Sequence, residues 1–286
     1  MDRDYIVGGH RFRVSGERLL AVLECIEGFK PFRTDRVDVP PEFVFRESER
    51  ESVQTFCKGL YSFKYEDIDS VFGVTADGYL LELHPAGEKP LCLWMRQGAT
   101  EAYLYGNCTP RLLRFALWMG YGILTVRKDT VAVHSSCIVY KEKAVLFLGE
   151  SGTGKSTHTS LWREHIAGSK LLNDDSPVVC YRDGKIWVHG SPWSGKTPCY
   201  KAECYPLAGC VRLSQAPYNR MYELKTMQSF AALHPSTPPA FAYDSWLYDG
   251  ICGMLGKLLP VVPVYHLACL PDREAAELAC RTLFAE

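Results

Sequence analysis

The 286-residue sequence has no strong bias in charge. Lysine and arginine number 32 against 33 aspartate and glutamate, the formal net charge is −1, and no long run carries one sign. A surface without excess positive charge suits neither duplex nucleic acid nor an anionic membrane, so we expect neither as a partner. Hydrophobic residues at 47% and aromatic residues at 12% exclude wholesale disorder and predict a globular protein.

Long apolar runs are also missing. No stretch approaches the ~20 residues needed to span a bilayer, and residues 1–5 lack the apolar core of a secretory signal. The 12 cysteines are scattered and none forms a C-x-x-C pair, which predicts reduced, mostly buried thiols rather than disulfides or a zinc site. From these absences we expect a cytoplasmic location.

The N-terminal part of the chain reads as strands and turns. Polar and apolar residues alternate at 11–14 and 79–83, and Asp77-Gly78 carries a hairpin signal. Helical spacing begins after Thr109-Pro110, with a predicted buried stripe of Leu112, Phe115, Ala116 and Met119. The chain therefore divides, by prediction, into a β-rich region 1–108 and an α/β nucleotide-binding domain 109–286.

The most specific feature is a phosphate-loop pattern. Residues 149–156, GESGTGKS, fit G-x-x-x-x-G-K-[ST] (Walker A) at every specified position, with an apolar strand at 144–148 before them and a helix from 156 to about 166 after them. Glycines let backbone N–H groups approach phosphate, Lys155 would add a charge for the β- and γ-phosphates, and the Ser156 hydroxyl would ligate Mg²⁺. The predicted nucleotide contacts are Gly149, Ser151, Gly152, Thr153, Gly154, Lys155, Ser156 and Thr157.

Two adjacent carboxylates, Asp174 and Asp175, follow about 20 residues later within a strand pattern at 170–181. A parallel strand returning beside the first would bring one of them to the metal on Ser156. On its own the pair would equally suit a solvated turn. The loop context favours a metal site made by Ser156, Asp174 and Asp175.

Two further segments leave alternatives open. Residues 130–140 are expected to form one strand, which makes a hairpin with 144–148, and a lone histidine such as His134 is more often structural than functional. Residues 190–198, GSPWSGKTP, suit either an ordinary connector or a substrate loop. In the second case the contacts would be Trp193, Ser194, Gly195 and Lys196. A strand at 208–213, a late strand at 260–267 and helices near 225–233, 246–259 and 272–283 complete the predicted α/β body.

The order VAVHS, hairpin, GESGTGKS and NDDSPVV resembles the HPr kinase/phosphorylase catalytic domain, which shares its nucleotide-binding core with ATP-dependent phosphoenolpyruvate carboxykinases. GSPWSGKTP and VPVYHL also resemble smaller HPr-kinase-like proteins found with peptide-modification systems. The resemblance is strongest over 130–198. It implies a mixed-sheet core, ATP with Mg²⁺, and homo-oligomers.

The same resemblance implies site roles. Lys155, Asp174, Asp175 and His134 would be catalytic, with one aspartate serving Mg²⁺ and the other the acceptor hydroxyl, in an order that the resemblance does not assign. His134 occupies the histidine position of the family's M-H-G motif, although its context here is Val-His-Ser. GSPWSGK replaces the glycine-rich segment of true HPr kinases, so HPr itself is not the expected acceptor.

The leading functional prediction is transfer of the ATP γ-phosphoryl group to a serine-type hydroxyl of a protein, peptide or small molecule. A phosphoenolpyruvate carboxykinase-type enzyme is an alternative, but it would need a second metal and several arginines near the loop. A non-catalytic ATP-binding regulatory module is another, although such a module has no need of both aspartates.

Overall fold

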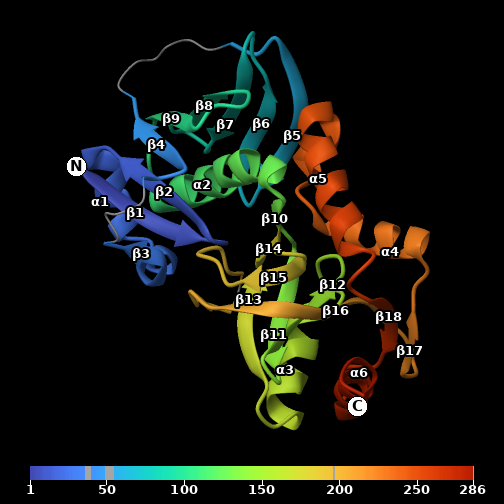
Figure 1. The fold of residues 1–286 in the computed structure, drawn as a ribbon. Helices are drawn as coiled ribbons and strands as arrows, with labels where there is room; N and C mark the ends of the chain where they lie inside the picture. Colours follow the sequence, from blue (N-terminus) through green and yellow to red (C-terminus); the bar gives the residue numbers. More distant parts are fainter. Residues whose placement is uncertain (36–39, 49–54, 196, 286) are drawn as a thin grey trace. The chain divides into compact units, whose positions relative to one another are not determined.

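The computed structural model describes residues 1–35, 40–48, 55–195 and 197–285 (Figure 1). The chain forms two compact units, one of Met1–Lys128 with Ala240–Tyr248 and one of Asp129–Pro239 with Asp249–Glu286. The sequence predicts a boundary after residue 108, whereas the structure keeps helix α2 (Pro110–Thr125) in the first unit. There the Tyr121 hydroxyl donates to the Val7 carbonyl at 3.0 Å, so the apolar side of α2 belongs to the N-terminal core.

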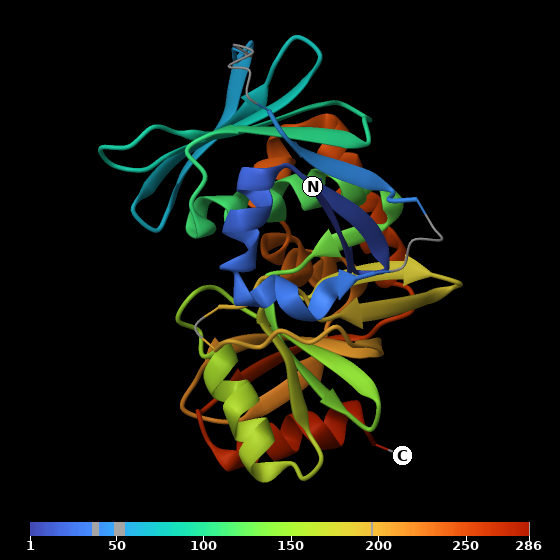
Figure 2. The ribbon, with the colours of Figure 1, turned by 90° about the vertical axis from the view of Figure 1, so that its left-hand side faces the viewer.

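Nine strands of the described residues form the sheet of the first unit (Figure 2), in the order β3-β1-β2-β4-β9-β8-β7-β6-β5. Neighbours are antiparallel except in the pairs β2–β4 and β4–β9. The strands are β1 (Asp2–Val7), β2 (His10–Ser15), β3 (Arg33–Thr34), β4 (Phe43–Glu47), β5 (Lys58–Tyr65), β6 (Ile68–Val74), β7 (Gly78–His84), β8 (Leu91–Arg96) and β9 (Glu101–Gly106). The predicted β-rich character of this region is confirmed.

Helices α1 (Glu17–Glu24) and α2 lie against this sheet. Thr109 caps α2, since its hydroxyl oxygen accepts from the Leu112 amide at 3.5 Å. In the predicted stripe Leu112, Ala116 and Met119 are buried and Phe115 is half-buried. The sequence did not predict α1.

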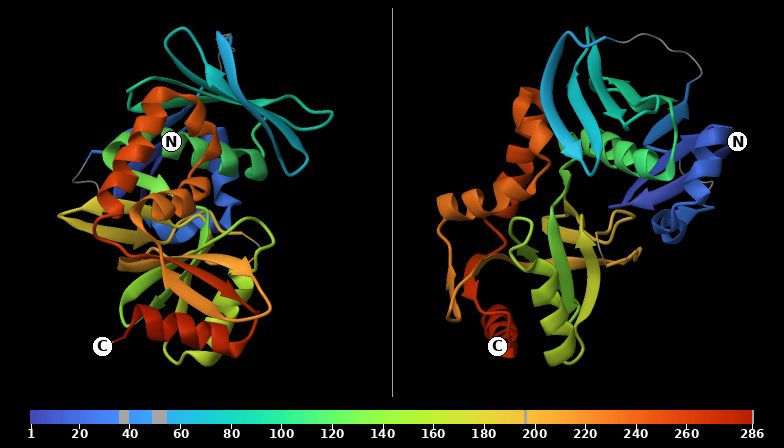
Figure 3. Two further views of the ribbon diagram at one scale, coloured as in Figure 1. Left: turned by 90° about the vertical axis from the view of Figure 1, so that its right-hand side faces the viewer. Right: turned by 180° about the vertical axis from the view of Figure 1, so that it is seen from behind.

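The second unit contains a mixed sheet (Figure 3), in the order β10-β14-β15-β16-β12-β11-β13, with β18 on β16 and β17 on β18. Its strands are β10 (Thr130–Ala132), β11 (Ser135–Tyr140), β12 (Lys143–Leu148), β13 (Lys170–Asp175), β14 (Val178–Arg182), β15 (Lys185–His189), β16 (Cys204–Gln215), β17 (Arg220–Glu223) and β18 (Val264–Cys269). Its helices are α3 (Lys155–His165), α4 (Thr226–Leu233), α5 (Ser245–Leu258, whose start belongs to the first unit) and α6 (Arg273–Leu283). The predicted α/β class with mixed sheets is confirmed.

Two expectations about this sheet are wrong. Residues 130–140 form two strands, because the chain breaks at His134, whose amide donates to the Ser236 carbonyl at 2.7 Å. Strand β13 does not lie directly beside β12, since β11 lies between them and is antiparallel to both. β12 and β13 therefore still run parallel, and both point toward the same edge of the sheet.

Strand β13 contains one extra residue relative to β11. Ile138 pairs with Leu171 and Cys137 pairs with Asn173, so Leu172 is left without an opposite residue. This β-bulge shifts the register of everything that follows it in β13, including Asp174 and Asp175.

Helices α3 and α6 pack side by side against one face of the sheet, over a core that includes the fully buried Trp162 and Phe147. The twelve cysteines carry free thiols, and nine of them are buried or partly buried, as expected. Within the described residues, no helix combines the length and apolar character that crossing a membrane requires.

His158 on α3 should make this core sensitive to acid. Its ring is buried, its Nε2 accepts from the Trp162 indole at 3.2 Å, and burial lowers the pKa of His158 to about 4. In the unfolded chain the His158 imidazole binds a proton near pH 6.5, whereas in the folded chain it stays neutral down to about pH 4. The free energy of unfolding therefore falls by on the order of 2 kcal/mol between about pH 7 and pH 5. Urea titrations at both pH values test this. The control His158→Gln has no titrating group at this position, so its free energy of unfolding should fall clearly less between the two pH values. An equal fall in both proteins would contradict the attribution of the pH dependence to His158.

Candidate functional site

The phosphate-loop pattern forms a compact turn between β12 and α3. The Thr153 hydroxyl donates to the Glu150 carbonyl at 2.7 Å and folds the loop onto itself. A Cβ on Gly149 would lie 2.3 Å from Thr153 Oγ1, so only glycine fits at the start of the turn. The predicted nucleotide-contacting residues thus lie together, with the free amides of the first turn of α3 beside them. Their contact with a nucleotide stays a prediction.

Lys155 lies with its side chain folded under this loop. Its Nζ donates to the carbonyls of Gly149 at 2.7 Å and Glu150 at 3.2 Å. Burial lowers the pKa of Lys155 below its ordinary value, the nearby Asp175 charge raises it, and the Arg212 charge lowers it further. A partly desolvated ammonium group of this kind interacts strongly with an incoming anion.

The two predicted acidic residues point to opposite faces of the sheet. Asp174 pairs with Ser136 of β11, and Ser136 Oγ lies 3.0 Å from Thr159 Oγ1 on α3, so this face is the α3 face. Ser156 Oγ donates to Asp174 Oδ1 at 3.0 Å on the same side. Asp175 follows directly and projects to the other face, because side chains alternate along a strand.

His134 lies within the site rather than apart from it. Its Nδ1 is 3.3 Å from Asp175 Oδ1, and its Nε2 is 3.1 Å from Lys155 Nζ. The imidazole can therefore connect carboxylate and ammonium, although which nitrogen carries the proton depends on the tautomer. The sequence left the role of His134 open, and the structure brings it into contact with both partners.

The loop after β15, residues 190–198, packs against the strand that carries the acidic pair. Trp193 is 2% exposed and its carbonyl accepts from Asn173 Nδ2 at 3.2 Å, while Ser194 is buried and its Oγ donates to the Thr197 carbonyl at 2.6 Å. We therefore no longer expect the side chains of Trp193 and Ser194 to contact a substrate, because both are enclosed by their own unit. Lys196 lies outside the described residues.

Gly195 is the member of this loop closest to the acids. Its amide donates to the Asp174 carbonyl at 2.7 Å, and a Cβ at this position would lie 2.7 Å from the same oxygen. A larger residue would push the loop away from β13. Gly195 therefore positions the acidic pair whether or not a substrate also touches it.

Arg212 is a site residue that the sequence reading missed. It lies on β16 opposite Leu148, the residue before the phosphate loop, and its Nη2 is 3.4 Å from Glu150 Oε1. The available signal was a single cation in the otherwise apolar strand pattern at 208–213. No sequence pattern predicted that this strand pairs with the strand before the phosphate loop.

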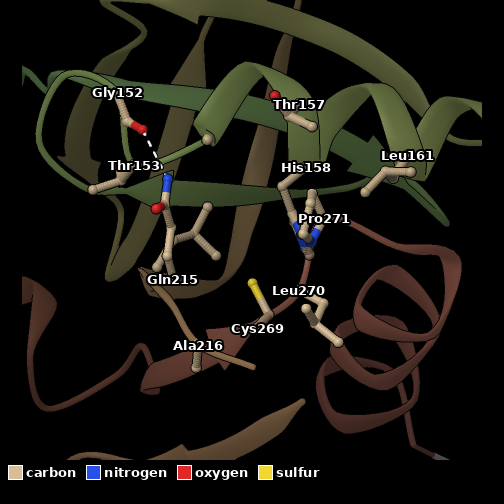
Figure 4. Close-up of a pocket in the computed structure, with 12 residues that line it drawn as sticks. Gly152, Thr153, Thr157, His158, Leu161, Gln215, Ala216, Cys269, Leu270 and Pro271 are labelled. Atoms are coloured by element: carbon tan, nitrogen blue, oxygen red, sulfur yellow. Dashed lines mark hydrogen bonds between the residues drawn. The ribbon is translucent and has the colours of Figure 1, made fainter. Parts of the chain in front are cut away.

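A pocket of about 690 Å³ adjoins the α3 side of the loop (Figure 4). Loop backbone forms one wall, and Leu161, Leu213, Cys269 and Leu270 supply apolar surface. Gln215 Nε2 donates to the Gly152 carbonyl at 3.2 Å across its edge. Apolar surface beside a polar loop suits a group such as a nucleobase.

The residues present fit a magnesium ion that keeps water and phosphate oxygens in its coordination shell. Within the described residues, no cluster of three or more His, Cys, Asp or Glu side chains is arranged to hold a metal. Mg²⁺ is commonly bound through only one or two carboxylates plus substrate phosphates, so the Ser156 hydroxyl and the Asp174 carboxylate are a sufficient protein contribution.

Comparisons with known proteins give a distant similarity. No protein-family model matches the sequence, and no curated protein matches it. Among solved structures, the chain is similar to the HPr(Ser) kinase/phosphatase from Coxiella burnetii, with 12% identity, a TM-score of 0.30, and coverage of 53% of this chain and 92% of that one. We rest neither fold nor function on a similarity of this size, and no family assignment follows from it.

Proposed function

We propose that the protein is an ATP-dependent kinase that transfers the γ-phosphoryl group to a hydroxyl of a protein, peptide or small molecule. The supporting observation is the pair of aspartates at the phosphate loop: Asp174 accepts a hydrogen bond from Ser156, and Asp175 Oδ1 lies 3.3 Å from His134 Nδ1. A loop that only held a nucleotide would have no use for the second carboxylate.

In this proposal the chain binds ATP through three features. Loop amides and Lys155 hold the phosphates, and the pocket beside α3 receives the base. Ser156 and Asp174 would hold Mg²⁺, which would neutralise negative charge on the phosphate groups when bound.

Asp175 is the proposed base that accepts the proton of the acceptor hydroxyl. The sequence did not indicate which of the two aspartates has this role. It lies on the face opposite Asp174, and His134 orients its carboxylate. The acceptor oxygen bonds to the γ-phosphorus, the bond from that phosphorus to the ADP oxygen breaks, and Asp175 takes the hydroxyl proton. Because the transition state is loose, the proton leaves late and a carboxylate of modest pKa is adequate.

Lys155→Ala is expected to weaken ATP binding or turnover at least about tenfold, since a charge-assisted contact to phosphate contributes roughly 1.5–3 kcal/mol. Calorimetry with Mg·ATP and transfer of γ-label to candidate acceptors measure both quantities. Lys185→Ala, an exposed lysine at the start of β15, is the matched control. Unchanged affinity and turnover in Lys155→Ala would count against the loop assignment.

The same label assay separates the alternatives. ATP binding without transfer to any acceptor would support a regulatory module. Formation of phosphoenolpyruvate from oxaloacetate and ATP would support a carboxykinase instead.

A further inference from the structure

Residues paired across six strands form one row on the face of the sheet opposite α3. Strand register links each to the next, and side chains of directly paired residues project to the same face. The row consists of Asp175, Ser135, Leu148, Arg212, His266 and Tyr222. The phosphate loop begins immediately after Leu148, so the base proposed above and Arg212 lie on the same face, on opposite sides of the loop entrance.

Arg212 is held here by a weak and replaceable partner. Its side chain is 20% exposed, whereas that of Glu150 is 81% exposed. Within the described part of the chain, Glu150 is the carboxylate with which Arg212 forms an ion pair. Ion pairs with a largely solvated partner contribute about 0–1 kcal/mol, so a stronger anion can displace Glu150 at little cost.

Glu150 is itself the second residue of the phosphate loop. Its backbone carbonyl accepts from Lys155 Nζ at 3.2 Å while its carboxylate faces Arg212. The Arg212 charge also reaches Lys155, whose pKa it lowers. Two cations that converge on one loop residue form a site for a group with several negative oxygens, such as a terminal phosphate.

We propose that Arg212 contacts the γ-phosphate of bound ATP, and that Glu150 is the competing anion that holds Arg212 when no γ-phosphate is present. The exchange would make the protein discriminate ATP from ADP, because only ATP carries the group that displaces Glu150. This inference rests on the proposed kinase function.

The test compares the affinities of Mg·ADP and the non-hydrolysable analogue Mg·AMPPNP by calorimetry. Arg212→Gln should weaken AMPPNP binding about 10–100-fold and change ADP binding little, as expected for the loss of one charged hydrogen-bonding partner. Arg212→Lys keeps the positive charge but cannot form a bidentate contact with phosphate. Its affinity for AMPPNP should lie between those of wild type and Arg212→Gln. Arg220→Gln, an exposed arginine on β17, is the control and should bind both ligands as wild type does.

Glu150→Gln should raise the preference for AMPPNP over ADP several-fold, and this gain should vanish in the Glu150→Gln/Arg212→Gln double variant, since the two residues act on one another. Equal losses for both ligands in Arg212→Gln, or additive effects in the double variant, would overturn the inference while leaving the kinase proposal intact. Wild-type protein that binds neither nucleotide would overturn both.

Discussion

Replacing Asp175 with asparagine is expected to lower the rate of phosphoryl transfer by about 10²–10⁴-fold while leaving Mg·ATP bound. Asparagine keeps the size of the side chain and can still contact His134, but it cannot accept the hydroxyl proton. Single-turnover transfer of γ-label at saturating Mg²⁺ measures the chemical step, and calorimetry on the same protein measures binding. The loss should appear in the rate alone.

Asp174→Asn is the matched counterpart, because it changes the neighbouring residue on the other face. Here the expected result is a higher Mg²⁺ requirement, with transfer recovering as Mg²⁺ is raised, since the amide is a poorer ligand than the carboxylate beside Ser156. The reverse pattern would show that the two roles are exchanged. Full transfer in both variants would show that neither aspartate takes part.

The second large effect concerns the helix that carries the loop. Trp162→Ala should lower the unfolding free energy by about 3–5 kcal/mol, because truncation of a large buried aromatic residue leaves a cavity. The Trp162 ring is fully buried, lies 5.7 Å from the Phe147 ring, and its indole donates to His158. Urea titration followed by circular dichroism gives the change.

Trp162→Phe separates packing from hydrogen bonding. Phenylalanine keeps most of the ring volume and loses the indole N–H, so a smaller loss is expected, of about 1–3 kcal/mol for the unsatisfied partner and the missing atoms. If Trp162→Ala lowered the unfolding free energy less than Trp162→Phe does, the stability of α3 would not depend on the packing of Trp162. The assignment of Trp162 to the core would then be wrong.

The sequence predicted the parts of the site that depend on local chemistry. The glycines and Lys155 define the loop by their own geometry, and a strand before and a helix after it are visible in the hydrophobic pattern. The acidic pair was visible for the same reason. What they bind stays a prediction.

The sequence could not predict what depends on strand order. A strand–helix–strand unit favours adjacent parallel strands, but β11 enters between β12 and β13. Arg212 was missed for the same reason, since its nearness to the loop arises only from the pairing of β16 with β12. The stripe of α2 showed that the helix has a buried side without showing which sheet covers it, so the predicted boundary fell before it.

The burial of individual loop residues was the other property that the local sequence pattern could not predict. Trp193 lies among glycine, serine and proline, a composition typical of exposed loops, yet it is enclosed. Asn173 explains this, because its amide donates to the carbonyls of Ser191 and Trp193 and draws the loop inward.

The bulge at Leu172 decides which aspartate can do which task. Without the bulge, Leu172 would pair with Cys137, Ser136 would pair with Asn173, and Ser135 would pair with Asp174. Asp174 would then turn away from Ser156 and toward the side of the sheet that Asp175 now occupies. One leucine that has no counterpart on the adjoining strand thus determines which of two chemically identical acids lies on the same face as Ser156.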